Sequence, residues 1–433
     1  TTETKPIGIE YDVVPDFREE KTETVSVGLN NNLSSFLAGF IPGVVPIVLP
    51  SSHQEFVRFR SAVITKVINR YGILDETIAY DLGSKVSTKN LAYDSETGLV
   101  LLTKTKTNFE DDIYNFNYPA HWYYDAMGQA YKNLGLTFSN LSPNSNGEIT
   151  INNASGFFVP GDEIVADNKD LAWVKSINGN VVTLINEMGN PFKPNGSILN
   201  MIITRSGRRN LIGVSMGSIT ALSNPVEGLE SNSFSNVLNT GTQIFKDEWQ
   251  TFCECFENNS RLKHTNNPYV IGTKGTWRAY KGFSYLVDRK HSWKNNNTDI
   301  RNDGVFTSFN PFWKYGGGRI TPDETNWTWT SEITVMNPYG AELENKDALE
   351  RYSASVYGYN NTLPTAVGAN TKYREIAFDA FEDYDFNTCS DDHFSFKPHK
   401  LSLSNESHSG RHSISVSAGG SLSISRNLSV CTP

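Results

Sequence analysis

Residues 381–416 read FEDYDFNTCSDDHFSFKPHKLSLSNESHSGRHSISV, and this stretch decides the fold class. Apolar and polar residues alternate in three short runs, so each run has one face to bury, as a half-buried β-strand does. The alternating apolar pairs are Phe394 and Phe396, Leu401 and Leu403, and Ile414 and Val416. Ser409-Gly410 predicts a turn between strands. A closed sandwich needs about seven strands, so we expect residues 381–433 to be a partial β-sandwich domain.

The composition is typical of a protein built from many short strands. The chain has 433 residues and a mass of 48.3 kDa, which is enough for about two to four domains. Only 38% of the residues are hydrophobic, while 12% are aromatic, and this balance favours strands with one wet face and aromatic burial. We therefore predict a mainly β protein of several β-sandwich or β-barrel modules with one or two short helices.

The charge excludes one class of partner. The formal net charge is −9 and the isoelectric point is near 5.5, whereas nucleic-acid binding needs a basic face. We expect no nucleic-acid partner. The densest basic cluster consists of Arg205, Arg208 and Arg209, and we interpret it as a solvated loop rather than an anion site.

The most apolar run is FLAGFIPGVVPIVLP at residues 36–50. It is too short to span a bilayer as a helix, and it contains three prolines. We predict a buried extended segment here and no membrane-spanning segment.

Residues 1–146 are predicted to be a β-rich N-terminal scaffold. The β-branched residues at 56–73 favour a strand. The best helical signal lies near 119–134, where Pro119 suits the first turn and Gly135 suits the stop.

A compact insert is predicted at residues 147–200. Four short strands follow one another between 147 and 188, and Asn178-Gly179 between two of them is a strong hairpin signal. The PGDEI turn, the Trp-Val strand and the NGNVVTL hairpin resemble small SH3-like or β-barrel modules.

Residues 201–380 are predicted to be a Trp- and Asn-rich β core. Its one helical candidate is Val237 to Phe256, in which aromatic residues recur at helical spacing: Phe245, Trp249, Phe252 and Phe256.

Tryptophans supply the candidate ligand site, because flat aromatic faces can stack on sugar rings. The candidates are Trp277, Trp313, Trp327 and Trp329, with Trp293 as a fifth. Burial in the core is the competing interpretation. Trp327 and Trp329 would share a face if their segment is a strand.

Acidic residues near the predicted sandwich supply a candidate calcium site, because carboxylate oxygens are hard ligands. These residues are Glu382, Asp383, Asp385 and Asp391. Paired carboxylates such as Asp111-Asp112 could alternatively serve glycoside hydrolysis. Ser215-Met216-Gly217-Ser218 lacks the flanking pattern expected of a nucleophile elbow, and we predict no catalytic residue in the chain.

The four cysteines give one candidate disulfide. Cys389 and Cys431 flank the sandwich-like segment and could pair in an oxidising compartment. Cys253 and Cys255 are too closely spaced for a zinc pair or an easy mutual bridge.

Several segments together carry a family resemblance. They include NLAYDSETGLVLLT at 90–103, KGTWRAYKGFSYL at 274–286 and YREIAFDAFEDYDF at 373–386, and the others are residues 113–131, 303–313 and 337–370. In combination they resemble a region of very large secreted or cell-surface β-rich proteins of Bacteroidota, of the type associated with type IX secretion or with Rhs/YD neighbours. The stretch at 381–416 resembles the start of a jelly-roll module of the carbohydrate-binding type.

The resemblance implies an extracellular, secreted or cell-surface location and a non-enzymatic, structural or adhesive function. It also implies contact with other domains of the same long chain or with surface-assembly proteins, and contact with glycans in the alternative. Two other functions stay open: a glycan-binding accessory region of a carbohydrate-active enzyme, and a shell segment of a secreted Rhs-type toxin. The expected cofactors are none, apart from the candidate structural calcium.

Overall fold

The fold is that of a computed structural model, which describes residues 9–38, 41–70, 72–108, 111–166, 170–194, 199–249, 265–290, 304–337, 339–359, 361–376, 378–383 and 403–420. Strand accounts for 50% of the structure and helix for 7%, so the predicted mainly β fold class is confirmed. The chain divides into two compact units: residues 8–71 form one, and residues 1–7 together with 72–433 form the other.

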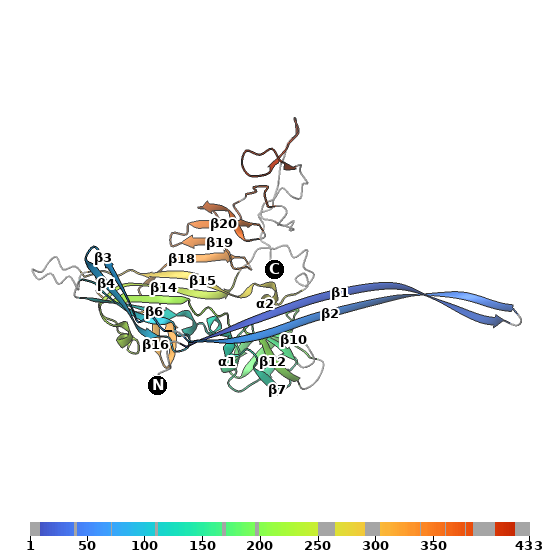
Figure 1. The fold of residues 1–433 in the computed structure, drawn as a ribbon, viewed down its shortest axis with the longest axis horizontal. Helices are drawn as coiled ribbons and strands as arrows, with labels where there is room; N and C mark the ends of the chain where they lie inside the picture. The colour runs from blue at the N-terminus through green and yellow to red at the C-terminus, as the bar shows by residue number, and fades with distance from the viewer. Residues whose placement is uncertain are drawn as a thin grey trace, which may run out of the picture. The chain divides into compact units, whose positions relative to one another are not determined.

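The smaller unit is a two-stranded antiparallel ribbon with a marked twist (Figure 1). Strand β1 (Ile9–Ala38) pairs with β2 (Ile41–Arg70) in one unbroken register, from Ile9 opposite Arg70 to Ala38 opposite Ile41. Each strand has 30 residues, which corresponds to about 100 Å of extended chain. The described residues of the apolar run at 36–50 are therefore extended, as predicted, while the burial of their side chains lies outside what the structure describes.

The larger unit contains one antiparallel sheet of eleven strands (Figure 1). Its strands are β3 (Glu76–Asp81), β4 (Ser84–Tyr93), β5 (Val100–Lys106), β6 (Asp112–Pro119), β13 (Ser215–Ala221), β14 (Val237–Glu248), β15 (Lys274–Tyr285), β18 (Trp327–Met336), β19 (Glu342–Asp347), β20 (Tyr352–Gly358) and β21 (Leu363–Ala369). They lie in the sheet in this same order, so the sheet is a meander.

This meander changes the predicted domain boundaries. β6 comes from the predicted scaffold at 1–146 and β13 from the predicted core at 201–380, yet they are paired, with Phe116 opposite Ile219. Residues from both segments therefore belong to one sheet rather than to two domains. The ladder hydrogen bonds between β6 and β13 are the physical reason, because they continue the sheet across the insert.

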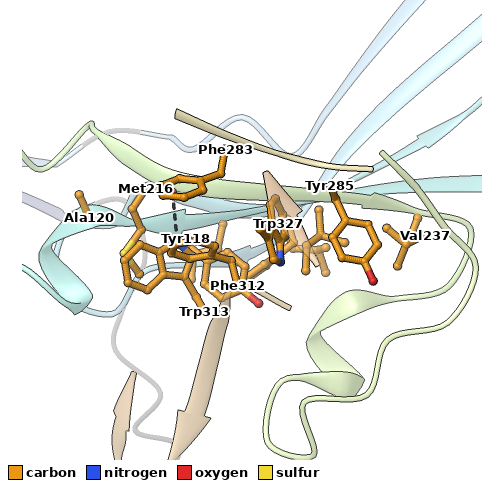
Figure 2. Packing of buried hydrophobic residues seen from close by; sticks show 14 of the residues in the cluster. Tyr118, Ala120, Met216, Val237, Phe283, Tyr285, Phe312, Trp313 and Trp327 are labelled. Atoms are coloured by element: carbon orange, nitrogen blue, oxygen red, sulfur yellow. Dashed lines mark hydrogen bonds between the residues drawn. The ribbon is translucent and has the colours of Figure 1, made fainter. Parts of the chain in front are cut away.

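Aromatic side chains dominate the core beneath the sheet, as the composition predicts. Figure 2 shows Phe283, Tyr285, Phe312, Trp313 and Trp327 gathered in one cluster. Two of these residues do not belong to the large sheet. Trp313 is the first residue of a hairpin formed by β16 (Trp313–Gly316) and β17 (Arg319–Pro322), and Phe312 directly precedes it. The hairpin sits in the chain between β15 and β18 and contributes its first residue to the core.

The insert after β6 is a separate six-stranded sheet with its own hydrophobic core. Its elements are β7 (Thr137–Leu141), β8 (Glu148–Thr150), α1 (Ala154–Phe157), β9 (Glu163–Ala166), β10 (Leu171–Asn178), β11 (Val181–Ile185) and β12 (Leu199–Arg205). The predicted hairpin at Asn178-Gly179 is present, with Asn178 opposite Val181. β7 and β12 also pair with each other, so the sheet extends over 137–205, beyond the predicted limits of 147–200.

The predicted helix near 119–134 is wrong. The segment forms three separate single turns of 3₁₀-helix: η1 (Ala120–Trp122), η2 (Asp125–Met127) and η3 (Ala130–Lys132). The carbonyls of Ala126 and Met127, which a helix would use internally, instead accept the N–H groups of Arg209 and Leu211. Tertiary hydrogen bonds thus replace the helical ones. The described part of the second helical candidate, Val237 to Phe256, is strand β14 up to Glu248.

The predicted partial sandwich at 381–433 is described only in part. Residues 403–420 contain one short hairpin of β22 (Leu403–Ser404) and β23 (Ser413–Ile414), with Leu403 opposite Ile414. Phe394 and Phe396 lie outside the described residues. The remaining short elements are η4 (Pro225–Gly228) and α2 (Pro268–Ile271). Across the described ranges, the structure contains no helix with the length and apolar character needed to cross a membrane.

Candidate functional site

The four candidate tryptophans do not form an open stacking platform. Trp313 and Trp327 are buried, at 3% and 9% exposure. The indole N–H of Trp313 donates to the Met216 carbonyl at 3.1 Å, and that of Trp327 donates to the Asn310 carbonyl at 3.0 Å. Both are core residues, so the competing interpretation of burial is correct for them. Trp293 lies outside the described residues.

Trp277 and Trp329 are half-buried at the margin of the same core. The Trp277 ring packs edge-on against Tyr124, with 5.3 Å between ring centroids. Trp327 and Trp329 both pack on this core from β18, so the expectation that they share a face is confirmed.

A shallow depression lies beside the two buried tryptophans. Its lining includes Tyr118, Thr242, Phe309, Trp313 and Trp327. Its cavity volume is only ≈ 10 Å³, close to the minimum that one water molecule requires. A sugar ring does not fit there.

The candidate calcium ligands do not converge among the described residues. Glu382 accepts the backbone N–H groups of Arg411 and His412, at 2.6 and 2.9 Å. Asp383 accepts the backbone N–H of Tyr359 at 3.0 Å. The two carboxylates therefore brace different segments. Asp385 and Asp391, and the candidate disulfide cysteines Cys389 and Cys431, lie outside the described residues. In the described part of the chain, no three His, Cys, Asp or Glu side chains are grouped to hold a metal ion.

The structure does assemble a cluster of lysines and aromatic rings around Glu332, on neighbouring strands β14, β15, β18 and β19 and at Trp249, the residue that follows β14. We call it the Glu332 cluster, and its members are Lys246, Trp249, Tyr280, Lys281, Trp329, Glu332 and Lys346. These four strands are consecutive in the sheet, and this adjacency brings together residues that are up to 100 positions apart in the sequence.

Glu332 is the hub of this cluster. It accepts a hydrogen bond from the Tyr280 hydroxyl at 2.9 Å. Its other carboxylate oxygen lies 3.5 Å from the ammonium groups of both Lys281 and Lys346. Burial acts to raise the pKa of Glu332, but the Tyr280 hydroxyl and the two lysines outweigh it and lower this pKa. Glu332 is therefore held in its charged form.

Lys246 has a different environment. Its ammonium group lies 4.5 Å from the centroid of the Trp249 ring and 4.1 Å from that of Tyr280, so two aromatic faces hold it by cation–π attraction. Trp249 is itself fixed, because its indole N–H donates to the Thr276 carbonyl at 2.9 Å. Burial, aided by Lys281, lowers the pKa of Lys246, and Glu332 opposes this change. With three lysines and one glutamate, the cluster carries a net charge of +2 in a protein whose overall charge is −9.

A second polar group lies buried beneath the YDSETG turn. Asp94 accepts from the Trp122 indole at 2.8 Å and from the Thr97 hydroxyl at 2.7 Å, and it lies 3.3 Å from Nε2 of His121. Burial acts to raise the pKa of Asp94, but the contacts with His121, Thr97 and Trp122 outweigh it and hold the pKa well below its usual range. The contacts with His121 and Trp122 join the turn to η1, and the bond from Thr97 closes the turn itself, so we assign this group a structural role.

The arginine cluster is not the solvated loop that the sequence predicts. Arg205 is exposed, but Arg208 is 4% exposed, and its guanidinium donates to Asp125 at 2.7 Å. Next to it, Asp162 accepts hydrogen bonds from the Asn133 side chain and from the Gly207 backbone. Asp162 thereby joins the insert to the segments that precede and follow it in the chain, and the Arg208–Asp125 ion pair joins those two segments to each other.

The expectation that Ser215 lacks the flanking pattern of a nucleophile elbow is wrong. Residues 213–217 read GVSMG, which matches the GxSxG pattern. Ser215 is the first residue of β13, however, whereas an elbow places the serine between a strand and a following helix. Its hydroxyl donates to the carbonyls of Tyr118 and Gly217, at 3.1 and 2.8 Å. The motif here serves strand pairing.

Among the residues of the Glu332 cluster, only Trp329 is predicted from the sequence as a site residue. The signal that could have found it is the alternation of lysine with aromatic residues in WRAYKGF at 277–283 and in FKDEW at 245–249. Comparison with protein-family models, with curated proteins and with solved structures finds no match to this chain.

Proposed function

We propose that the chain is a non-enzymatic structural and adhesive segment of a large secreted or cell-surface protein, and that it acts through surface contact. The observation that carries this proposal is the meander itself. Eleven strands drawn from residues 76–369 lie in chain order in one sheet with a filled aromatic core. A sheet of this kind offers wide, fixed surfaces, which is what a structural segment requires.

The polar side chains of the larger unit support the same proposal. Glu382 and Asp383 brace loops, Ser215 stabilises strand pairing, and Asp94 holds a turn. Each of these groups has a hydrogen-bonding role in the fold. These structural roles account for the polar side chains without assigning any of them to a chemical reaction.

A screen for turnover tests the non-enzymatic part of the proposal. The full chain is assayed against panels of glycosidase, peptidase and esterase substrates, and we expect no turnover above that of heat-denatured protein. Robust turnover that is abolished by one substitution, for example Ser215→Ala or Asp383→Asn, would overturn the proposal.

A glycan-binding role is the second candidate, and the Glu332 cluster is the observation that favours it. Its net charge of +2 selects for an acidic ligand, and its lysine ammonium groups already lie over the aromatic rings of Trp249, Tyr280 and Trp329. We therefore propose that any glycan bound here is carboxylated or sulfated rather than neutral. Rings that hold lysines in place reduce the side-chain entropy lost on binding.

Retention on immobilised polysaccharides tests this second role. We expect the full chain to be retained by a sulfated or carboxylated polysaccharide more strongly than by a neutral one, and to be released as the salt concentration rises. Lys246→Ala combined with Lys346→Ala should weaken retention about tenfold, on the basis of one to two charged contacts. The matched control, Lys175→Ala with Lys193→Ala, removes two exposed lysines of the insert and should leave retention unchanged. Equal retention of both double variants would contradict a site at Glu332.

A further inference from the structure

The three lysines of the Glu332 cluster do not hold their charge in the same way. Lys281 and Lys346 share one oxygen of the Glu332 carboxylate, each at 3.5 Å from it, and lie 5.1–5.8 Å from the ring centroids that they contact. Lys246 instead lies close to two aromatic rings, whose centroids are 4.5 and 4.1 Å from its ammonium group. A carboxylate cancels positive charge, whereas a ring attracts a cation through its quadrupole and carries no net charge.

The carboxylates that attract Lys246 are each paired with other lysines. Glu332 and Glu248 both act electrostatically on Lys246. Glu332 is already shared by the two other lysines of the cluster, and Glu248 lies 3.2 Å from the ammonium group of Lys274. Lys246 therefore keeps most of its unit charge for a ligand that arrives from solution.

The two rings beside Lys246 are themselves anchored. Trp249 is 4% exposed, and its indole N–H donates to the Thr276 carbonyl at 2.9 Å. The Tyr280 hydroxyl donates to Glu332 at 2.9 Å. Because both rings are fixed, the ammonium group that they attract loses less side-chain freedom when a ligand binds. Lys246 is only half-buried, so it remains within reach of a ligand.

Glu332 opposes the binding of an anion at Lys281 and Lys346. Its single negative charge offsets half of the positive charge of these two lysines. An acidic group that approaches either ammonium group also approaches the Glu332 carboxylate, and like charges repel. The Glu332 side chain is 15% exposed, and salt screens a partly buried charge less than an exposed one. Glu332 thus occupies the position that an acidic ligand would otherwise take.

We propose that Lys246 is the residue that contacts the acidic group of a bound glycan, and that Glu332 shields Lys281 and Lys346 from this group. The site then takes one sulfate or carboxylate group at Lys246. It selects a ligand by the position of that single charge beside two aromatic rings, and not by charge density alone. This inference rests on the proposed glycan-binding role, and it assigns the residues that make and limit the contact.

Single substitutions in the full chain separate the three lysines. Retention is measured on immobilised dextran sulfate and carboxymethyl dextran, with unmodified dextran as the neutral reference. Lys246→Ala should weaken retention on the acidic matrices at least about fivefold, because it removes the principal charged contact. Lys281→Ala and Lys346→Ala should each cause a smaller loss, of about twofold, because Glu332 already offsets part of their charge. Lys246→Arg keeps the cation beside the rings and should retain most of the binding.

Glu332→Gln should have the opposite effect. The glutamine keeps an oxygen that can accept from the Tyr280 hydroxyl but carries no charge. Lys281 and Lys346 then become available to the ligand, and retention should rise at least about fivefold. Glu227→Gln is the matched control, because it removes the same charge from an exposed glutamate outside the cluster, and its retention should equal that of the wild type. Circular dichroism and thermal unfolding check that each variant is folded.

The possible results separate this inference from the role on which it rests. An equal loss in all three lysine-to-alanine variants would show that binding follows net charge alone. Retention of Glu332→Gln that does not exceed that of Glu227→Gln would show that Glu332 is no shield. Either result overturns the inference and leaves the glycan-binding role in place. A wild-type chain that the acidic matrices retain no better than unmodified dextran overturns the role and the inference together.

Discussion

Trp313 donates its indole N–H to the Thr242 hydroxyl at 2.7 Å, and this bond, which shares the N–H with the Met216 carbonyl, joins the β16–β17 hairpin to strand β14 of the large sheet. Thr242 in turn donates to the Met216 carbonyl at 2.7 Å on β13. One threonine therefore links the hairpin to two neighbouring strands. The bond is buried, and a buried hydrogen-bonding group that loses its partner costs more than the bond itself contributes.

Replacement of Trp313 by phenylalanine should lower the free energy of unfolding by about 1–3 kcal/mol, because it removes the indole donor and part of the ring volume from a buried site. Urea denaturation measures the change. Thr242→Val should not add its full cost to that of Trp313→Phe, since both variants remove the same bond. Trp329→Phe is the control, because that ring contacts lysine ammonium groups at the core margin, and we expect it to cost less than about 1 kcal/mol. Full additivity of the two buried substitutions would show that the bond does not couple hairpin and sheet.

Asp162 should make stability depend on pH. Burial raises the pKa of this carboxyl from 3.8 to about 6. Because the folded chain then keeps a proton that the unfolded chain has already lost, the contribution of Asp162 to stability is highest below about pH 4 and falls as the pH rises to about 6, by on the order of 3 kcal/mol.

The comparison that isolates this effect is with Asp162→Asn, which cannot titrate. All other groups titrate equally in both proteins, so the difference between their free energies of unfolding should shrink between pH 4 and pH 7 as the wild type loses its advantage. Denaturant titrations at several pH values give this difference. A constant difference across the range would mean that the carboxyl does not carry a raised pKa.

The insert should fold by itself when it is cut at the right residues. A fragment of 137–205 contains all six strands and a complete hydrophobic core, and we expect a single cooperative thermal transition. In the full chain, deletion of only 147–188 would remove β8 to β11 and leave β7 and β12 with an exposed apolar face, so we expect that variant to aggregate. A well-folded 147–188 deletion would show that the outer strands belong to the large sheet instead.

Asn267 should be important for the contact between the insert and the large sheet. Its side chain accepts the Tyr269 N–H at 3.0 Å as the N-cap of α2 and donates to the Asn186 carbonyl, also at 3.0 Å. Asn267→Ala removes both bonds and should cost about 2–3 kcal/mol, whereas Asn267→Ser keeps a capping oxygen and should cost about 1 kcal/mol. Thermal unfolding ranks the two variants. Equal losses of stability in the two variants would indicate that the capping hydrogen bond from the Tyr269 N–H contributes nothing.

The parts of the fold that the sequence predicts correctly depend on local chemistry. Asn178-Gly179 turns a hairpin as expected, and Gly179 has the positive φ of +59° that such a turn needs. Strands β9, β10 and β11 of the insert follow from alternation and turn residues, and β10 pairs with the strand before it and the strand after it in the chain. β8 is also predicted as a strand, but its partner is β11, and this pairing does not follow from local chemistry.

The predictions that fail depend on distant partners. The spacing of four between Phe245 and Trp249 fits one face of a helix, but an even spacing also fits one face of a strand, and only the pairing with β13 and β15 decides between them. Residues 119–134 do not form the predicted helix, because their backbone carbonyls accept hydrogen bonds from residues some eighty positions later in the chain. The Glu332 cluster likewise exists only because the sheet brings four strands together.

The pairing of β7 with β12 has a consequence for how the chain folds. β6 and β13 are neighbours in the sheet, although residues 120–214 separate them, and closing so long a loop costs conformational entropy. Once the insert has formed, the pairing of Leu141 with Leu199 brings its two ends together, and the loop that remains to be closed is short. The insert is therefore expected to form before the centre of the sheet does, and it sets the order in which the two halves of the meander meet.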